Sequence, residues 1–342
     1  MSRKKTAALI LLCAACVCAQ DKIQVPVLDG EWWKIAEREP DVGEYNNPGK
    51  HNVCDFTIWQ AADGTWQLVS CVRDVNWPIV GKRIFHRWEA KNLTDRDWKP
   101  MGVFLTPREE MNQYASIQAP HCFKYDGKYY FFYNGGTAPG AHIPLDPANP
   151  TKGRSIGNSS WCMVSEDGKT FTDIKNTEGS FPFFSMGRDM MVFHDTDRER
   201  FIAYFQDAKL PGETPNKNGA MYFRTAPKPE GPWSKERTNI NNLGNPESPF
   251  VIKKGDKYYL WEQMKVFVSD TPENFSDHPI TKMTPGPVHG KYAPEILLVD
   301  GQYYIAGYEP GIWLAKFKWE EKTIDEINAW RKSFGIAIDP EQ

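Results

Sequence analysis

Residues 119–130 read APHCFKYDGKYY and residues 293–304 read APEILLVDGQYY. In both stretches the aspartate of an Asp-Gly pair stands six positions after the proline, and two tyrosines end the stretch. Asp-Gly permits the positive φ angles of a tight two-residue turn, and the aromatic and branched residues on either side favour strands. Each stretch therefore predicts a β-hairpin, and their identical spacing indicates a repeat.

Three further stretches follow the same plan: residues 55–66 (DFTIWQAADGTW), 188–197 (RDMMVFHDTD, with a longer turn) and 247–259 (ESPFVIKKGDKYY). When the five copies are aligned, one residue of each takes nearly the same place, at intervals of 63, 71, 58 and 45 residues: Asp55, Gln118, Asp189, Glu247 and Tyr292. Repeats of this length with several strands apiece predict a β-propeller.

Further strand-forming segments lie between the hairpins, at residues 84–98, 161–171, 221–233 and 266–275. With the hairpins they complete an all-β fold, a five-bladed β-propeller of four-stranded antiparallel blades. Residues 323–334 predict a short C-terminal helix, with Thr323 as its cap and Glu326 three positions later. Residues 23–33 are expected to pack along the rim or to add an outer strand that closes the ring.

Residues 1–19 combine a basic start, an apolar stretch and small residues before Gln20, which predicts a cleaved signal peptide. We therefore expect a protein exported to the periplasm or the extracellular space. A lipid-anchored form, acylated at Cys16 or Cys18, is the alternative. Residues 20–342 are expected to form a single propeller domain, with segment 20–50 and the C-terminal helix packed on it.

The remainder of the chain excludes several classes of function. Without the three basic residues of the leader, 38 basic residues stand against 44 acidic ones, and no basic block suggests binding to nucleic acid. No later apolar segment approaches the length of a membrane span. Four cysteines follow the leader without any Cys-x-x-Cys pair, which permits a disulfide and disfavours a zinc site. The oligomeric state stays open.

A propeller places the first strand of every blade along one axis, so carboxylates that are distant in sequence can share a pocket. Asp55, Asp189 and Glu247 are the candidates. A single carboxylate at a strand start is more often a capping or turn residue, but three in matching register favour a common site. Carboxyl groups that share a pocket but differ in protonation state can serve one as an acid and the other as a base or nucleophile.

With this periodicity the chain resembles the five-bladed propeller glycoside hydrolases, above all family 43 and more distantly family 32, over residues 51–319. The resemblance implies that Asp55 is the base, Glu247 the general acid, and Asp189 the neighbour that raises the pKa of that acid. Arg188-Asp189 is similar to the Arg-Asp pair of family 32, but Met190 replaces the proline that follows there. Asp55 also lacks the Asn-Asp-Pro-Asn-Gly setting of family 32, which argues against invertase-type specificity.

Several other residues fall near the starts of the inner strands and are candidates for substrate binding: His51, Gln118, His121, Arg188, His289 and Tyr292. Arg188 would bind a sugar hydroxyl or a substrate carboxylate, or form a structural ion pair. The resemblance implies that His289 lies near the axis and helps to hold a bound ion or a water network there, the ion being a structural calcium; no cofactor is required for the chemistry. Glu295 is a competing candidate for the acid, three positions beyond the register of Glu247.

These observations predict a secreted, exo-acting and inverting glycoside hydrolase that acts on a plant or algal polysaccharide or oligosaccharide. The alternative is a catalytically silent propeller that binds sugar, because His121 and Met190 replace residues common in the relatives. A phosphorolytic enzyme ranks lower, since only Arg188 and His51 are placed to bind phosphate.

Overall fold

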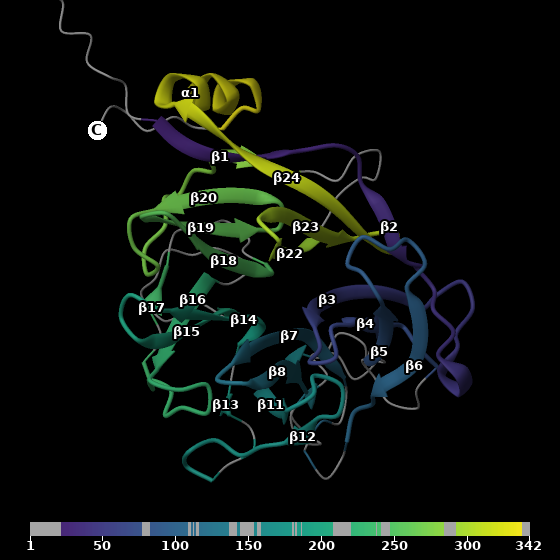
Figure 1. The fold of residues 1–342 in the computed structure, drawn as a ribbon. Coiled ribbons are helices and arrows are strands. Elements are labelled where there is room, and N and C mark those ends of the chain that lie inside the picture. Colours follow the sequence, from purple (N-terminus) through teal and green to yellow (C-terminus); the bar gives the residue numbers. More distant parts are fainter. Residues whose placement is uncertain are drawn as a thin grey trace, which may run out of the picture.

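The computed structural model describes residues 22–76, 83–108, 111, 113, 116–136, 142–143, 154–155, 159–179, 181, 183–185, 187–207, 220–236, 238–240, 247–283 and 292–336. The predicted signal peptide and His289 lie outside these residues. The described chain forms five antiparallel sheets arranged around a centre, which confirms the predicted five-bladed propeller (Figure 1).

Each of the first three blades begins with its innermost strand. Blade 1 consists of β3 (Asn52–Gln60), β4 (Trp66–Arg73), β5 (Arg83–Ala90) and β6 (Lys99–Leu105). Blade 2 consists of β7 (Ile117–Tyr125), β8 (Lys128–Gly135), β11 (Ser159–Ser165) and β12 (Thr172–Asp173), with β13 (Phe184–Ser185) also paired to β11. Blade 3 consists of β14 (Arg188–Asp195), β15 (Arg200–Asp207), β16 (Ala220–Ala226) and β17 (Thr238–Asn239).

The last two blades close the ring. Blade 4 consists of β18 (Pro249–Lys254), β19 (Lys257–Glu262), β20 (Lys265–Ser269) and β21 (Thr281–Lys282). Blade 5 consists of β22 (Tyr292–Val299), β23 (Gln302–Tyr308), β24 (Ile312–Thr323) and β1 (Lys22–Leu28), with β2 (Trp33–Ala36) also paired to β24. The N-terminal segment therefore supplies the outermost strand of blade 5, the second of the two positions expected for it. A short 3-10 helix, η1 (Gly43–Tyr45), leads from there toward blade 1.

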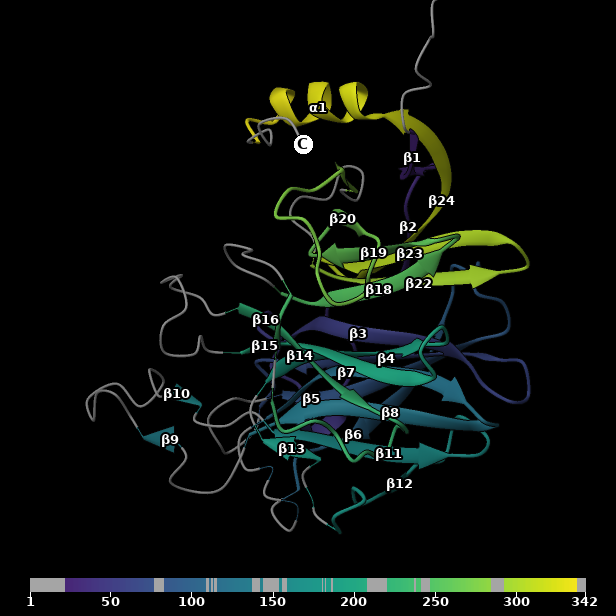
Figure 2. The ribbon, with the colours of Figure 1, turned by 90° about the vertical axis from the view of Figure 1, so that its left-hand side faces the viewer.

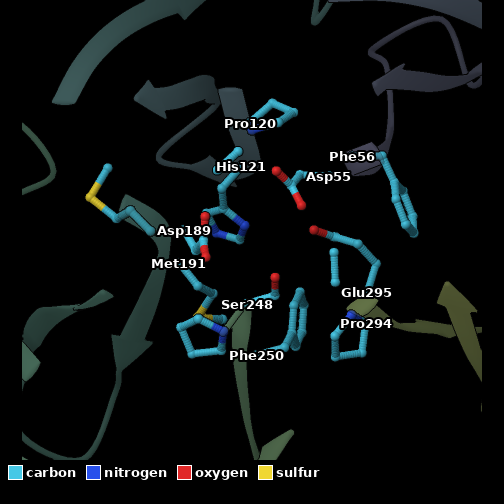
Figure 3. A pocket seen from close by; sticks show the side chains of 14 residues that line it. Asp55, Phe56, Pro120, His121, Asp189, Met191, Ser248, Phe250, Pro294 and Glu295 are labelled. Atoms are coloured by element: carbon cyan, nitrogen blue, oxygen red, sulfur yellow. The ribbon is translucent and has the colours of Figure 1, made fainter. Parts of the chain in front are cut away.

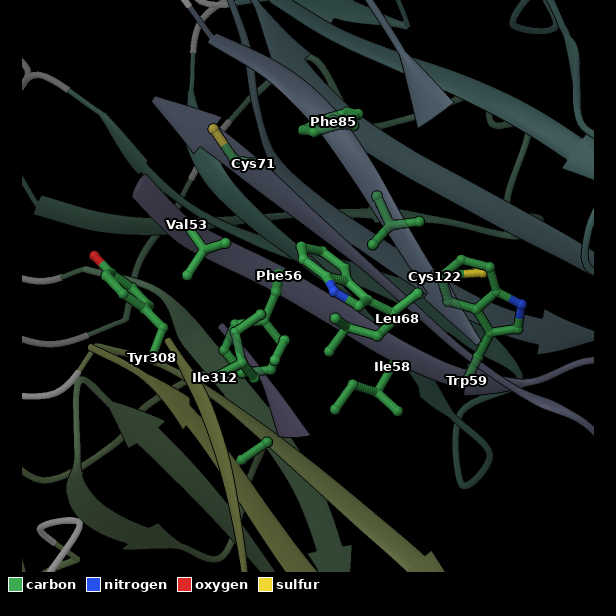
Figure 4. Close-up of a cluster of buried hydrophobic side chains, with 14 of the residues drawn as sticks. Val53, Phe56, Ile58, Trp59, Leu68, Cys71, Phe85, Cys122, Tyr308 and Ile312 are labelled. Atoms are coloured by element: carbon green, nitrogen blue, oxygen red, sulfur yellow. The ribbon is translucent and has the colours of Figure 1, made fainter. Parts of the chain in front are cut away.

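The inner strands contact one another in the cyclic order β3, β7, β14, β18, β22 and back to β3. Alternate residues of these strands fill the spaces between blades with apolar side chains. Figure 4 shows one such cluster, in which Phe56, Leu68 and Ile312 from blades 1 and 5 pack together. Trp59 and Trp261 are buried in the blades, as expected for packing residues. All four cysteines in the described residues are buried free thiols.

The predicted hairpin turns and C-terminal helix are confirmed. Asp126 and Gly127 have φ angles of 48° and 77°, and Asp300 and Gly301 have 49° and 80°, as a tight two-residue turn requires. Helix α1 (Ile324–Ser333) begins at Thr323, whose side chain and Glu326 form a capping box. The helix packs on the outside of the ring against β24 and β21 (Figure 2). Within the described residues no helix is long and apolar enough to cross a membrane.

A sixth sheet, of two strands, is separate from the blades and consists of β9 (His142–Ile143) and β10 (Arg154–Ser155). It falls within residues 135–155, a stretch rich in Gly and Pro of which most lies outside the described residues.

Candidate active site

A repeated irregularity shapes the mouth of the propeller. Four inner strands shift register close to their starts, between Val53 and Phe56, Gln118 and His121, Arg188 and Met191, and Tyr292 and Glu295. Four residues at this place adopt left-handed backbone angles with φ between 48° and 55°: Ala119, Asp189, Ser248 and Ala293. A β-bulge bends its strand and re-aims the side chains beside it. In these four blades the bulge therefore turns side chains toward the axis, and in blade 4, where the pairing of β18 with β19 shows no shift, the left-handed Ser248 stands at the corresponding place.

The three candidate carboxylates come from different positions of this bulge. Glu247 directly precedes the left-handed residue of blade 4, Asp189 is itself the left-handed residue of blade 3, and Asp55 is the second residue inside the bulge of blade 1. The alignment of the five sequence copies therefore matched the positions of these three carboxylates in their blades to within two residues. Aspartate tolerates left-handed angles better than most residues, which suits it to the position in blade 3.

The bulges surround a pocket on the propeller axis (Figure 3). It holds about 320 Å³ of space, counting the part open to solvent. Each blade contributes two or three consecutive lining residues: 55–56, 119–121, 189–191, 248–250 and 293–295. Asp55 and Asp189, 134 residues apart in the chain, thus line the same cavity.

Arg188 connects the third carboxylate to this pair. Its Nη2 atom donates a hydrogen bond of 2.9 Å to Oε1 of Glu247, and its Nη1 atom lies 4.0 Å from Oδ2 of Asp189. The side chains of Arg188 and Glu247 remain 38% and 30% exposed, whereas that of Asp189 is 7% exposed. The site therefore combines a buried carboxyl with a more accessible one, as an acid that must meet a substrate requires.

Glu262, at the end of β19, holds the backbone of Glu247. Its Oε1 atom accepts a hydrogen bond of 3.2 Å from the Glu247 N–H, and its Oε2 atom accepts one of 3.1 Å from Nζ of Lys265. The Gln263 N–H also donates to the Glu247 carbonyl, at 3.2 Å. The backbone of the candidate acid is thus fixed on both sides, while its side chain is 30% exposed and bonded to Arg188.

Burial and charge act in opposite directions on the two aspartates. Burial raises the pKa of Asp55, while the guanidinium groups of Arg83 and Arg188 oppose that rise. Burial also raises the pKa of Asp189 to about 7; Arg188 opposes the rise, and the carboxylates of Asp55 and Glu247 add to it. Neighbouring carboxyl groups with different environments are the arrangement that separates an acid from a base.

Two residues of the site were not predicted from the sequence. Arg83, at the start of β5, donates a hydrogen bond through Nη1 to Oε1 of Gln118 and interacts electrostatically with Asp55 and Asp189. Tyr308, at the end of β23, is buried, and the nearby carboxylate of Asp55 contributes to the rise in its pKa. Both belong to strands behind the inner ones, so the repeat of inner-strand starts did not include them.

The other predicted binding residues are placed differently. Gln118 is buried and accepts the hydrogen bond from Arg83. His121 lines the pocket, its Nε2 atom lies 3.2 Å from the Val192 carbonyl, and burial lowers its pKa to about 4. His51 lies within hydrogen-bonding distance of backbone carbonyls, with Nδ1 2.8 Å from Asn47 O and Nε2 3.0 Å from Pro40 O, and it is not among the lining residues.

Tyr292 is described only through its backbone, which pairs with Tyr308. Glu295 lines the pocket and is 6% exposed. Burial raises the pKa of Glu295 well above its usual range, although its carboxyl group accepts a hydrogen bond from the Ile58 N–H. Unlike Glu247, it has no ion-pair partner among the described residues. A protonated axial side chain fits these surroundings better than an ionised one.

No group of three or more His, Cys, Asp or Glu side chains in the described residues is arranged to hold a metal ion. Calcium takes about six to eight oxygen ligands, and the described lining of the pocket supplies no cluster of three acidic side chains for it. A calcium ion on the axis, which would depend on His289, stays a prediction.

No protein-family model matches the sequence, and no curated protein matches it significantly. Solved structures do match. A thermostable family-43 glycoside hydrolase aligns with a TM-score of 0.55 at 17% identity, covering 82% of this chain and 96% of that chain. The GH43_1 enzyme from Xanthomonas citri, complexed with xylotriose, aligns with a TM-score of 0.56 at 14% identity, covering 85% and 93%.

An exo-1,5-α-L-arabinanase from a bovine ruminal metagenomic library aligns with a TM-score of 0.52 at 14% identity, covering 81% of this chain and 95% of that chain. The resemblance predicted from the sequence is thus confirmed at the level of the fold. At such low identity, the likeness leaves the activity to be argued from the site.

Proposed function

We propose that this protein is a glycoside hydrolase in which Asp55 is the base, Glu247 the general acid and Asp189 the residue that tunes the acid. One observation carries the proposal: Asp55 and Asp189 line one axial pocket, and Arg188 joins Asp189 to Glu247. Glycoside hydrolysis needs a proton for the departing oxygen and electron density at the anomeric carbon from the opposite face. Carboxyl groups from separate blades around one cavity are suited to both tasks.

In this mechanism the sugar ring enters the pocket from the mouth, and Glu247 delivers its proton to the glycosidic oxygen. Asp55 takes a proton from the water that attacks the anomeric carbon, so the anomeric configuration inverts. Asp189 and Arg188 are the charged neighbours of Glu247 in this arrangement, and Arg188 holds the Glu247 carboxyl group by a hydrogen bond. Inversion requires the carboxyl groups of Asp55 and Glu247 to lie roughly 6.5–9.5 Å apart, to leave room for the water.

The shape of the pocket and the predicted signal peptide bear on the substrate and on the location of the enzyme. Lining residues from all five blades make a pocket around the axis instead of a groove along the surface, which favours attack at the end of a chain. Plant or algal polysaccharides and their fragments are the proposed substrates. Export, with removal of residues 1–19, would bring the enzyme to them.

A screen of the purified protein against aryl glycosides and oligosaccharides tests the proposal. Hydrolysis of at least one glycoside, lowered by about 10²–10⁴-fold in Asp55→Asn, is the expected result. Asp63→Asn is the matched control, because Asp63 lies on the same hairpin but at its turn, where it binds Thr65 and Lys169. Equal activity in Asp55→Asn and wild type would refute the assignment.

The second candidate function is a silent sugar-binding propeller, favoured by His121 in the pocket lining, where it is held neutral by burial. Thermal unfolding with the same glycosides separates the two functions. A binder would shift its melting temperature with a sugar and release no product.

A further inference from the structure

A second guanidinium group, that of Arg83, interacts electrostatically with the same two aspartates as Arg188. Arg83 is the first residue of β5, the third strand of blade 1, and forms an isolated bridge with Ser116 just before the inner strand of blade 2. Its side chain donates to the Gln118 amide oxygen at the level of the bulges. Electrostatic interaction with both Asp55 and Asp189 places its charge next to the pocket.

Arg83 has few hydrogen-bond partners for its charge. A guanidinium group has five N–H donors in a planar fork. Within the described part of the chain, the Gln118 oxygen is the one acceptor bonded to Arg83, and it is a neutral amide. The nearby carboxylates of Asp55 and Asp189 interact with it through space without a hydrogen bond. A half-buried cation in such a position is costly unless a further acceptor approaches it.

The charge balance of the site points to a negatively charged acceptor. Two guanidinium groups, of Arg83 and Arg188, interact with the carboxyl groups of Asp55 and Asp189, and Arg188 also with that of Glu247. A fourth carboxyl group, that of Glu295, lines the pocket but is buried without an ion-pair partner in the described residues, which favours its neutral form. The proposed mechanism requires Glu247 to carry a proton when the substrate binds, and Asp189, with a pKa of about 7, carries one in a large share of molecules near neutral pH. In that state two cations face a single carboxylate, that of Asp55. One negative charge on the ligand restores the balance, whereas a neutral sugar does not.

We propose that the sugar bound in this pocket carries a carboxylate group, as a uronic acid does, and that Arg83 receives it. This inference rests on the proposed function, because it concerns the same pocket. The planar fork of arginine matches the two oxygens of a carboxylate, which makes it the side chain of choice for such a group. Gln118 orients the fork through the bond to Nη1 and leaves the remaining donors for the ligand.

The experiment compares 4-nitrophenyl glucuronides and galacturonides with the matching neutral glucosides and galactosides, in both anomeric forms. Wild type is expected to cleave a uronide with a kcat/KM at least about tenfold above that of its neutral counterpart. Arg83→Met, which preserves most of the side-chain length without the charge, should lower this preference at least about tenfold. Arg87→Met is the control, since Arg87 lies four residues further along the same strand and donates to the Lys169 carbonyl.

Preference for the neutral sugar in wild type, or an equal loss on both sugars in Arg83→Met, overturns the inference while leaving the hydrolase intact. If wild type cleaves neither these glycosides nor any other in the screen, the proposed function fails. The preference for a carboxylate-bearing sugar is then tested by ligand binding. Galacturonate or glucuronate should then raise the melting temperature of wild type, but not of Arg83→Met, while galactose and glucose do not. The absence of such a difference would overturn it.

Discussion

Nη2 of Arg188 lies 2.9 Å from Oε1 of Glu247, so a hydrogen bond joins blade 3 to blade 4 at the mouth of the axial pocket. Arg188 also lies 4.0 Å from Asp189. The charge of Arg188 also lowers the pKa of Asp55. One cation therefore interacts with all three carboxyl groups of the proposed mechanism.

Replacement of Arg188 should therefore change the pH dependence of the reaction. Arg188 lowers the pKa of Asp55 and Asp189, so Arg188→Met should raise both. Activity requires an ionised base, and the acidic limb of the pH profile of kcat/KM should move to higher pH, by about one unit. Arg198→Met, at the far turn of the same hairpin where Arg198 pairs with Asp195, should leave the profile in place. An unchanged profile in Arg188→Met would contradict the proposed electrostatics.

Glu262 should act on catalysis by holding the backbone of Glu247. Glu262→Ala removes the acceptor of the Glu247 N–H and should lower kcat by about 10–100-fold, because a displacement of about 1 Å at a reacting group has effects of this size. Glu262→Gln keeps an oxygen in place and should retain most of the activity. Steady-state kinetics, with circular dichroism as a check on folding, would measure this. Similar losses in both variants would show that charge, and not backbone position, is what matters there.

Asp189 should make the protein less stable as the pH rises. Its pKa is about 7 in the folded protein, against about 3.9 in an unfolded chain. Between these values the folded state retains a proton that the unfolded state has lost, so the free energy of unfolding falls as the pH rises through this window. Asp189→Asn removes the titrating group and should not show this fall. Between pH 4 and pH 8 the free energy of unfolding of wild type should therefore fall, relative to that of Asp189→Asn, by at most about 4 kcal/mol.

Urea unfolding at the two pH values would measure that difference. Asp197→Asn is a suitable control, because the hydrogen bond from Lys253 lowers the pKa of Asp197 and gives the opposite sign. A pH dependence of stability that is identical in Asp189→Asn and wild type would contradict the raised pKa.

Gly187, directly before Arg188, should be indispensable for the shape of the site. Its φ angle is 105°, and a Cβ atom added there would lie 2.6 Å from the Phe205 ring. Gly187→Ala should lower the free energy of unfolding by about 2 kcal/mol or more, from backbone strain and overpacking together. Gly179→Ala has a comparable φ of 77° but meets nothing within 4 Å, and should cost only about 1 kcal/mol. Chemical denaturation compares them, and equal losses would exclude the contact with Phe205 as a cause.

Local patterns were sufficient to predict the hairpins, the blade count and the capped helix. Asp126-Gly127 and Asp300-Gly301 fix their turns through their own backbone preferences, and Thr323 with Glu326 caps the helix within one turn. Turn and cap chemistry depends on neighbours in the sequence, which a single chain displays.

The composition of the site depends on contacts that the sequence does not display. The bulges arise from the pairing of inner strands with their neighbours, and they place Asp55 and Asp189 at different positions within one motif, while Glu247 directly precedes the left-handed Ser248 of blade 4. Arg83 interacts with Asp55 and Asp189 from a third strand, and Glu262 accepts a hydrogen bond from the Glu247 backbone from a second strand. Neither residue stands at the start of a repeat, so the alignment of the five copies had no means of selecting them.

The dependence of Glu247→Gln on the leaving group tests the central claim most directly. With the sugar found in the glycoside screen, kcat/KM should fall by about 10²–10⁴-fold for a poor leaving group that needs a proton, and far less for a 2,4-dinitrophenyl glycoside that departs without one. An equal fall for both leaving groups, or none for either, would contradict the assignment of Glu247 as the general acid.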